Sequence, residues 1–455
     1  MGTSSITAPT SDVTTLVEHL ASGSITSTKL TQGFLDRIDH TDEYLRAWQT
    51  VDSANALQQA HNADERRSHS KALGSLHGIP IGVKDIIDTA HLPTQRGSAI
   101  YKDRTPSAHA AVVEKLYEAG AIILGKTVTT EFAWMHPSVT RNAVNGDYSP
   151  GGSSSGSAAA VAAGQVPLAL GTQTGGSVIR PASYNGVFGY KPSRGLISRR
   201  GVLQTSPTLD QLGVFGNHVS DLCILVDALA GFDAQDSITY LGPKPKLHAG
   251  FLSEAPVAPA FAWIDMPYSD RYSESLKNGI DELCNVISTE TSATLDRIPA
   301  PKSFSALPAC HQIIYDVEIL QSLDTEWNQH RKLLSDTAKD GLQRATTRTD
   351  DEYQEALGIL EASEKWFDTF FHDYDGILTP SAPDIAPLYA NGTGDSICCV
   401  IWTLCGLPCL SMPLLTGNND MPLGIQLVGA YDRDDRLMRT ARWLLDALNN
   451  PIGEK

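Results

Sequence analysis

Apolar positions recur at helical spacing through the first part of the chain and predict three amphipathic helices. The first begins after Ser11 or Asp12, either of which can cap it, and ends near Gly23. The second and third cover about residues 26–40 and 53–67. Each helix carries one apolar stripe of the kind that packs on a protein core, and none carries residues that suggest chemistry.

From Leu76 onward, short apolar runs alternate with helical patterns. Residues 79–87 and 121–125 predict buried strands, and residues 110–119 between them predict a helix. This alternation favours α/β layers, in which helices cover a largely buried sheet.

The second half of the chain repeats this mixture in another order. Residues 270–372 are mainly helical in pattern, and strand patterns return at residues 375–380, 409–414 and 424–429. A final amphipathic helix is expected over residues 436–448. Because core-like sequence lies on both sides of the helical stretch, without a linker or a repeat, we expect one continuous domain.

The composition is that of a folded globular protein, with 41% hydrophobic and 19% charged residues. The chain has 35 basic and 52 acidic residues, which gives a net charge of −17. Such a charge repels phosphate backbones, so we expect no nucleic-acid partner and a small or neutral substrate.

Neither end of the chain nor its most apolar stretch suggests a membrane. The N-terminus lacks the pattern of a secretory signal, and Gly406, Pro408 and Pro413 interrupt the longest apolar stretch, residues 398–415. We expect that stretch to be a buried sheet segment. Its four cysteines have apolar neighbours, as core residues do, and an odd total of seven cysteines does not fit a disulfide framework. A reducing, cytoplasmic compartment is therefore expected.

A glycine- and serine-rich turn at residues 149–157 comes directly before a helix of small residues. Unpaired N–H groups at a helix start suit an anion or a polarised hydroxyl. A phosphate-binding loop would need a lysine after Gly156, and the chain has none there. Residues Gly152 to Gly156 also match the nucleophile elbow of α/β-hydrolases, with Ser154 as nucleophile, but a loop precedes them where an apolar strand is required.

A second turn, residues 171–180, places Gly175 and Gly176 next to Ser177. Two glycines allow a tight turn with several N–H groups pointing to one place, as an oxyanion hole requires. Ser177 beside them would be the nucleophile. Taken alone, the segment fits an ordinary turn equally well.

Three segments in this order, Gly-Val-Lys84-Asp, Gly-Gly-Ser153-Ser-Ser-Gly-Ser and Thr-Gly-Gly-Ser177, resemble the amidase signature family. The interval between the two serines is also the one that the family uses. The resemblance is dense over residues 76–216, which we take as the signature core, thinner near residues 375–445 and weak between them. Further similar segments occur at residues 77–85, 125–127, 131–133, 188–195, 406–408 and 422–429.

The resemblance implies a fold and a mechanism. The fold is a single α/β/α domain over residues 1–455, built around a large mixed β-sheet covered by helices. In the implied mechanism Ser177 forms an acyl-enzyme, Ser153, which the family carries on a cis peptide bond, relays the proton, and Lys84 is the base. This chemistry needs no metal and no cofactor. The implied oxyanion hole consists of backbone N–H groups of Thr174, Gly175, Gly176 and Ser177.

The role of base makes a physical demand on Lys84. A free lysine has a pKa of about 10.4, so a base that works near neutrality needs burial that lowers its pKa. Its neighbours in sequence, Ile81, Val83, Ile86 and Ile87, favour such burial. Without the resemblance, a strand-end lysine extending into solvent would be the simpler interpretation.

Two positions near Ser177 differ from the family pattern. Family members commonly carry an Asp four residues before the nucleophile and an Arg two residues after it. This chain has Gln173 and, three residues after Ser177, Arg180. The ion pair that supports the loop is therefore altered, which bears on substrate identity more than on bond cleavage.

The leading hypothesis is hydrolysis of a carboxamide, anilide or carbamate, in which water cleaves the Ser177 ester. The alternative is the amidase subunit of a tRNA-dependent amidotransferase, which passes ammonia to a partner, although the acidic charge argues against it. A catalytically silent scaffold is disfavoured because all three catalytic positions are filled.

We expect a small-molecule amide or carbamate as the substrate, no contact with nucleic acid or membrane, and a monomer or homodimer. The substrate pocket should draw on Ala133, Met135 and Tyr315 and on the variable helical region of residues 270–372.

Overall fold

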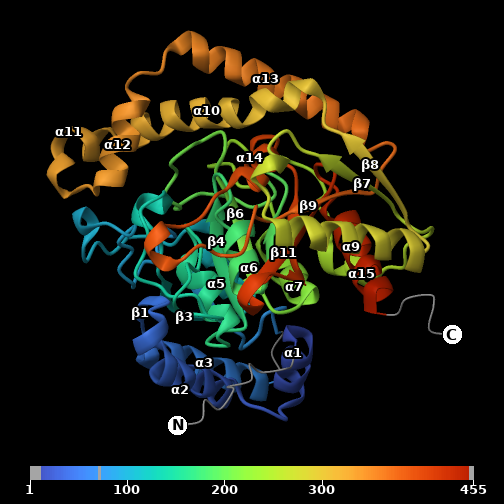
Figure 1. Cartoon of the computed structure of the whole chain (residues 1–455). Helices are drawn as coiled ribbons and strands as arrows, with labels where there is room; N and C mark the ends of the chain where they lie inside the picture. Colours follow the sequence, from blue (N-terminus) through green and yellow to red (C-terminus); the bar gives the residue numbers. More distant parts are fainter. Residues whose placement is uncertain (1–11, 70–72, 450–455) are drawn as a thin grey trace.

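Within the residues that the structure describes, eleven strands form one sheet that runs through the molecule (Figure 1). The computed structural model describes residues 12–69 and 73–449, so the expected cap at Ser11 and the N-terminal segment lie outside the described residues. The strands follow the spatial order β1–β3–β2–β4–β6–β5–β10–β11–β9–β7–β8. Their bounds are Trp48–Val51 (β1), Pro80–Lys84 (β2), Ile122–Thr127 (β3), Leu168–Gln173 (β4), Phe188–Lys191 (β5), Gln211–Gly216 (β6), Ala260–Asp265 (β7), Thr294–Pro299 (β8), Gly376–Pro380 (β9), Cys409–Thr416 (β10) and Pro422–Val428 (β11).

The sheet is mixed. Strand β2 pairs in parallel with β3 and β4, and β7 pairs in parallel with β8 and β9. The pairs β4–β6, β5–β6, β5–β10, β10–β11 and β9–β11 between these two groups are antiparallel. Every residue of β2, β3, β4 and β6 is buried, as expected for a sheet covered on both faces. The predicted single α/β domain with a large mixed sheet is confirmed.

Helices surround this sheet (Figure 1). Helices α1, α2 and α3 gather at one side of the molecule, and the long helices α10 and α13 run side by side across the opposite side. The bounds in the described chain are Val13–Ser22 (α1), Ser27–Leu45 (α2), Ser53–Ser68 (α3), Ala111–Glu118 (α4), Ser155–Ala162 (α5), Ile179–Asn185 (α6), Val219–Leu229 (α7), Leu247–Leu252 (α8), Glu274–Glu290 (α9), Leu307–Ser322 (α10), Asp324–Gln329 (α11), Asp336–Ala345 (α12), Asp350–Phe370 (α13), Ile397–Leu404 (α14) and Asp434–Asn449 (α15).

Local sequence explains where several helices begin and how they pack. Asp12 caps α1 by accepting a hydrogen bond from the Thr15 N–H at 2.7 Å. Thr349 and Glu352 form a reciprocal capping box at the start of α13. Helix α5 consists of small residues, and seven of its eight residues are buried. The small side chains let α5 pack closely on β4 and α6, the two elements that flank Ser177.

Two predictions about the second half of the chain need correction. The apolar stretch at residues 398–415 is not one sheet segment, because its first part forms the buried helix α14. That helix ends before Gly406, which has a φ of 66°, and β10 begins only at Cys409. The region 270–372 is mainly helical as predicted, but it also contains β8. That strand lies at the edge of the sheet and is largely exposed, so it has no apolar run that would reveal it.

The described part of the chain offers neither a membrane span nor a metal site. No helix in residues 12–69 or 73–449 is long and apolar enough to cross a membrane. The same residues contain no group of three or more His, Cys, Asp or Glu side chains that could hold a metal ion. The four clustered cysteines are free and buried, and burial raises the pKa of each thiol. They pack as small core residues.

Candidate active site

Lys84 is the last residue of β2 and is fully buried. Its Nζ lies 2.7 Å from Ser153 Oγ, 2.8 Å from Thr172 Oγ1 and 3.0 Å from Ser154 Oγ. Burial lowers the pKa of Lys84 well below its ordinary value, and the charge of Asp210 opposes this shift only in part. The environment that a neutral base requires is therefore present at this position.

The hydroxyls around Lys84 fit a neutral amine, which has two N–H bonds and one lone pair. Ser154 donates its single hydrogen to the Thr172 carbonyl oxygen at 3.2 Å, so its hydroxyl oxygen accepts from Lys84. The second N–H and the lone pair then face the hydroxyls of Ser153 and Thr172. Lys84 can thus accept a hydrogen bond from Ser153, the geometry that a proton relay needs.

Ser153 lies in the turn before α5, and the Gly152–Ser153 peptide bond is cis. The carbonyl oxygens on both sides of its backbone are held by other segments. Arg180 Nη2 donates to the Gly152 oxygen at 2.7 Å, and the Thr130 N–H donates to the Ser153 oxygen at 3.2 Å. The turn is therefore fixed from two directions, with the Ser153 hydroxyl buried against Lys84.

Ser177 lies between β4 and α6, on the wall of a cavity. Its Oγ makes no hydrogen bond to Ser153 or to any other group within the described residues. The structure thus brings Lys84 and Ser153 together and leaves the link from Ser153 to Ser177 open in the free protein. Catalytic hydrogen bonds often tighten only when substrate binds.

Three carbonyl oxygens of the loop before Ser177 are held by donors from three different helices. His311 of α10 lies with Nε2 2.7 Å from the Thr174 oxygen. Since a carbonyl oxygen only accepts, this nitrogen carries the hydrogen, and burial lowers the pKa of His311 and favours the neutral ring. The Thr403 hydroxyl of α14 donates to the Gly175 oxygen at 2.6 Å, and the Arg180 N–H donates to the Gly176 oxygen at 3.0 Å.

These contacts fix the direction of the loop N–H groups. Because the C=O and N–H of a trans peptide unit point in opposite directions, the N–H groups of Gly175, Gly176 and Ser177 face away from the three donors. None of the three donates to an acceptor within residues 12–69 and 73–449. At Gly176, moreover, a Cβ atom would lie only 3.0 Å from Ser396 and 3.1 Å from Cys399. The loop therefore presents free N–H donors and accommodates glycine at this close approach.

Gln173 occupies the position where the family commonly has Asp, and it supports the same loop without an ion pair. Its Oε1 accepts hydrogen bonds from the N–H groups of Val178 and Ile179 at 2.8 and 3.0 Å. Its Nε2 donates to the Thr403 hydroxyl oxygen at 2.9 Å. An amide supplies an acceptor and a donor, whereas a carboxylate supplies only acceptors, so Gln173 can hold both α6 and Thr403.

Asp210 is a neighbour of the loop that the sequence did not point out. Its buried carboxylate accepts from the N–H groups of Thr205 and Ser206 at 2.6 and 2.9 Å and from the hydroxyl of Thr174. Burial raises the pKa of Asp210, and these hydrogen bonds oppose the rise. An acidic residue placed directly before the buried strand β6 was the available signal. His311 and Thr403 carried no such signal, because only the tertiary fold brings their helices to the loop.

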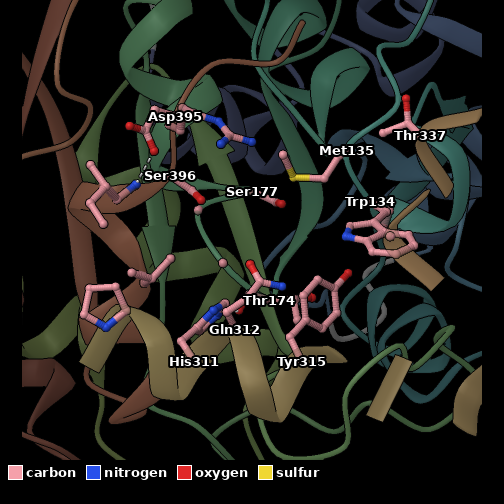
Figure 2. A pocket seen from close by; sticks show the side chains of 18 of the residues that line it. Trp134, Met135, Thr174, Ser177, His311, Gln312, Tyr315, Thr337, Asp395 and Ser396 are labelled. Atoms are coloured by element: carbon pink, nitrogen blue, oxygen red, sulfur yellow. Dashed lines mark hydrogen bonds between the residues drawn. The ribbon is translucent and has the colours of Figure 1, made fainter. Parts of the chain in front are cut away.

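Ser177 faces a cavity of about 470 Å³ (Figure 2). The predicted residues Ala133, Met135 and Tyr315 all line it. Tyr315 forms an edge-to-face pair with Trp134, with the ring centroids 5.9 Å apart. Figure 2 shows the two rings beside each other at one end of the cavity. The site therefore offers an aromatic corner within the same space as the proposed nucleophile.

Helix α12 closes the cavity over Trp134. A Cβ atom at Gly341 of this helix would lie 2.2 Å from the indole ring, so the contact needs glycine. Helices α10 and α12 both contribute lining residues and both fall within residues 270–372. This weakly patterned part of the chain thus supplies one wall of the cavity.

Comparisons with known proteins agree with this geometry. The chain is 32% identical to one subunit of the glutamyl-tRNA(Gln) amidotransferase of Chloroflexus aggregans, over 92% of this chain and 93% of that protein. Its structure matches a chain from a vestigial protein complex linked to the origins of an s-triazine catabolic enzyme. That match has a TM-score of 0.89 and 25% identity and covers 96% of this chain and 98% of the other. The peptide amidase of Stenotrophomonas maltophilia matches with a TM-score of 0.83 and 25% identity, over 96% of both chains.

The first of these relatives overturns the prediction about partners. The sequence led us to expect a small molecule as the only partner and to exclude nucleic acid, and that prediction is wrong. The relative from Chloroflexus aggregans is named as one subunit of an enzyme that acts on glutamyl-tRNA(Gln). The physical error is that a net charge of −17 describes the whole chain. It excludes neither a local contact nor a binding surface that another subunit provides.

The profile of the Amidase family matches residues 29–438, which is most of the chain. The matched stretch includes the Lys84–Ser153 pair, the loop that precedes Ser177 and the cavity beside it. Sequence, fold and local geometry thus lead to one conclusion: the chain belongs to the Amidase family of enzymes.

Proposed function

We propose that this protein breaks the C–N bond of a carboxamide by transferring the acyl group to Ser177, and that water then releases the acid. The observation that carries the proposal is the 2.7 Å contact between the Lys84 amine and the Ser153 hydroxyl, both buried. A lysine whose pKa is strongly lowered by burial, and whose lone pair can face a serine hydroxyl, has the properties of a general base.

The first half-reaction forms the acyl-enzyme. Ser177 Oγ attacks the carbonyl carbon while its proton moves to Ser153 and the Ser153 proton moves to Lys84. The negative charge on the carbonyl oxygen accepts hydrogen bonds from the N–H groups of Gly175 and Gly176. The relay then returns the proton to the leaving nitrogen as the C–N bond breaks, so an amine or ammonia departs.

The second half-reaction restores the enzyme. Water attacks the Ser177 ester and gives its proton to the relay, and the second oxyanion occupies the same loop. When the C–O bond to Ser177 breaks, the proton returns to Ser177 Oγ and the acid leaves. The sum is one amide and one water converted to one acid and one amine.

The bonds that we propose as substrates are amides outside peptide chains, with anilides and carbamates cleaved by the same steps. A carbamate would give a carbonate-like or carbamoyl ester on Ser177. The cavity of about 470 Å³ supports a small substrate, because small-molecule sites commonly measure roughly 300–1,000 Å³.

A second candidate is the amidase subunit of a tRNA-dependent amidotransferase. The identity of 32% to one subunit of such an enzyme, over nearly the whole chain, favours it. The acyl transfer to Ser177 would be the same, but the released ammonia would pass to a partner instead of leaving as product.

One experiment separates the two. The purified chain is incubated alone with a panel of primary amides, anilides and carbamates, and released ammonia or amine is measured beside a Ser177→Ala control. Turnover by the chain alone, lost in the control, supports hydrolysis. Ammonia release that requires the remaining subunits of an amidotransferase together with glutamyl-tRNA supports the second candidate. Turnover that persists in Ser177→Ala refutes both.

A further inference from the structure

The charged side chains of the cavity are not equivalent. Asp395 forms an ion pair with Arg271, and Arg344 forms one with Asp316 at 2.8 Å. Asp340 is exposed to solvent. Each of these groups is either neutralised by a partner or hydrated. The charged residues that line the cavity are Arg180, Asp340, Arg344 and Asp395.

Arg180 differs because it is buried and has no counter-ion. Its side chain is 4% exposed, and it forms no ion pair within the described residues. Its Nη1 donates to the Gly394 oxygen at 3.0 Å and its Nη2 to the Gly152 oxygen at 2.7 Å. Its Nε is buried without a hydrogen-bond partner. A guanidinium has five N–H donors, so two are used and the positive charge remains unpaired.

A buried cation without a counter-ion is costly, so an unpaired one is uncommon in a folded protein. The two carbonyl oxygens orient the guanidinium but carry no net charge to balance it. The acidic residue that commonly pairs with an arginine near the nucleophile is replaced by Gln173, which is neutral and is already used by α6 and Thr403. The balancing charge must therefore come from outside the chain.

We propose that Arg180 binds a carboxylate of the substrate, so that the favoured amides carry a carboxylate a few bonds from the reacting carbonyl. This inference rests on the proposed function, since it names the substrate class of the same site. Arginine suits this task because its planar fork donates two parallel hydrogen bonds to a carboxylate. Arg180 follows Ser177 by three residues and lines the same cavity, which limits the span between the carboxylate and the scissile bond.

The carboxylate can belong to either half of the substrate. A monoamide of a dicarboxylic acid carries it on the acyl half, and an N-acyl amino acid carries it on the amine half. Both offer the same anionic group to Arg180, and the choice of substrates in the test distinguishes them.

The first test uses the unmodified protein. Monoamides of dicarboxylic acids with four and five carbons are compared with the neutral amides of the same chain length, and N-acylglycines with their N-acylglycinamides. We expect kcat/KM to favour the charged member of at least one pair by roughly 10- to 100-fold, the range of a hydrogen bond to a charged group. Equal kcat/KM values within both pairs would overturn the proposal, whatever any variant does.

The second test uses Arg180→Met and Arg180→Lys, with Arg297→Met as a control that also removes one positive charge. Arg297 is half exposed and pairs with Asp265 and Asp281, on β7 and α9. Arg180→Met should abolish the preference for the charged substrate, Arg180→Lys should retain part of it, and Arg297→Met should leave it unchanged. Since Arg180 also holds two carbonyls, the thermal midpoint of each variant is recorded, and the preference is compared only among folded proteins.

A neutral fluorophosphonate that labels active serines separates this inference from the proposed function. Labelling of Ser177 combined with no preference for charged substrates leaves the proposed function intact and removes the role of Arg180. Failure of the reagent to label Ser177, together with no turnover of any amide, removes both.

Discussion

Replacing Lys84 with Met should change the way in which stability depends on pH. Burial lowers the pKa of Lys84 in the folded protein, whereas in the unfolded chain the amine has its ordinary pKa of about 10.4. At any pH between these two values the unfolded chain binds one proton more than the folded protein. The wild-type protein must therefore gain stability as pH rises through this window.

The size of the effect follows from linkage. One proton corresponds to a slope of about 1.36 kcal/mol per pH unit in the free energy of unfolding. An unfolding entropy of roughly 2.1 cal/mol/K per residue, taken over 455 residues, makes that slope about 1.4 °C in Tm per pH unit. The Lys84→Met variant has no such proton, so the difference in Tm between the two proteins should change by about 3 °C between pH 7 and pH 9.

The assay is differential scanning fluorimetry of wild type and Lys84→Met across that pH range. The variant also loses its contacts with Ser153, Ser154 and Thr172, which shifts its Tm by a constant amount and does not affect the slope. Lys29 is exposed on α2, and Lys29→Met is the matched control because its amine meets water in both states. A difference in Tm between wild type and Lys84→Met that stays constant from pH 7 to pH 9 would show that Lys84 is charged when folded, and the reasoning would fail.

The remaining predictions concern the relay, the loop and the cavity. Ser153→Ala should lower kcat by at least 100-fold, whereas Ser154→Ala, which removes another hydroxyl beside Lys84, should lower it less, as steady-state kinetics would show; equal losses would argue against a specific relay. Thr403→Val should lower kcat by roughly 10-fold with little change in KM, Thr403→Ser should restore it, and failure of that rescue would remove its role in orienting the loop. Gly341→Ala should push Trp134 into the cavity and raise KM, with a loss of roughly 1–3 kcal/mol in stability by denaturant titration; unchanged values would show that α12 can move away freely.

Sequence reasoning anticipated the parts of the fold whose side chains all serve one purpose. The buried strands and the helix between them were visible because every residue in β2 and β3 is inside the sheet. Strand β8 was missed for the opposite reason, since an exposed edge strand has no continuous apolar run. The stretch around Cys398 shows a further limit, because a short buried helix and a buried strand are equally apolar.

The candidate site divides in the same way. Lys84, Ser153 and Ser177 could be named because they lie in glycine-rich turns with a recognisable pattern. His311 and Thr403 could not, because each acts through one hydrogen bond to a loop more than a hundred residues away in sequence. The prediction about partners failed because it used the total charge, which carries no information about local surfaces.

The most direct test of the central claim is to find the acyl group on its residue. The protein is quenched in acid during turnover of a good amide substrate, and its peptides are analysed by mass spectrometry. The account predicts that the mass of the acyl half is added to the peptide that carries Ser177, and that Ser177→Ala shows neither the adduct nor turnover. An adduct on Ser153 or Ser154, or sustained turnover by Ser177→Ala, would contradict it.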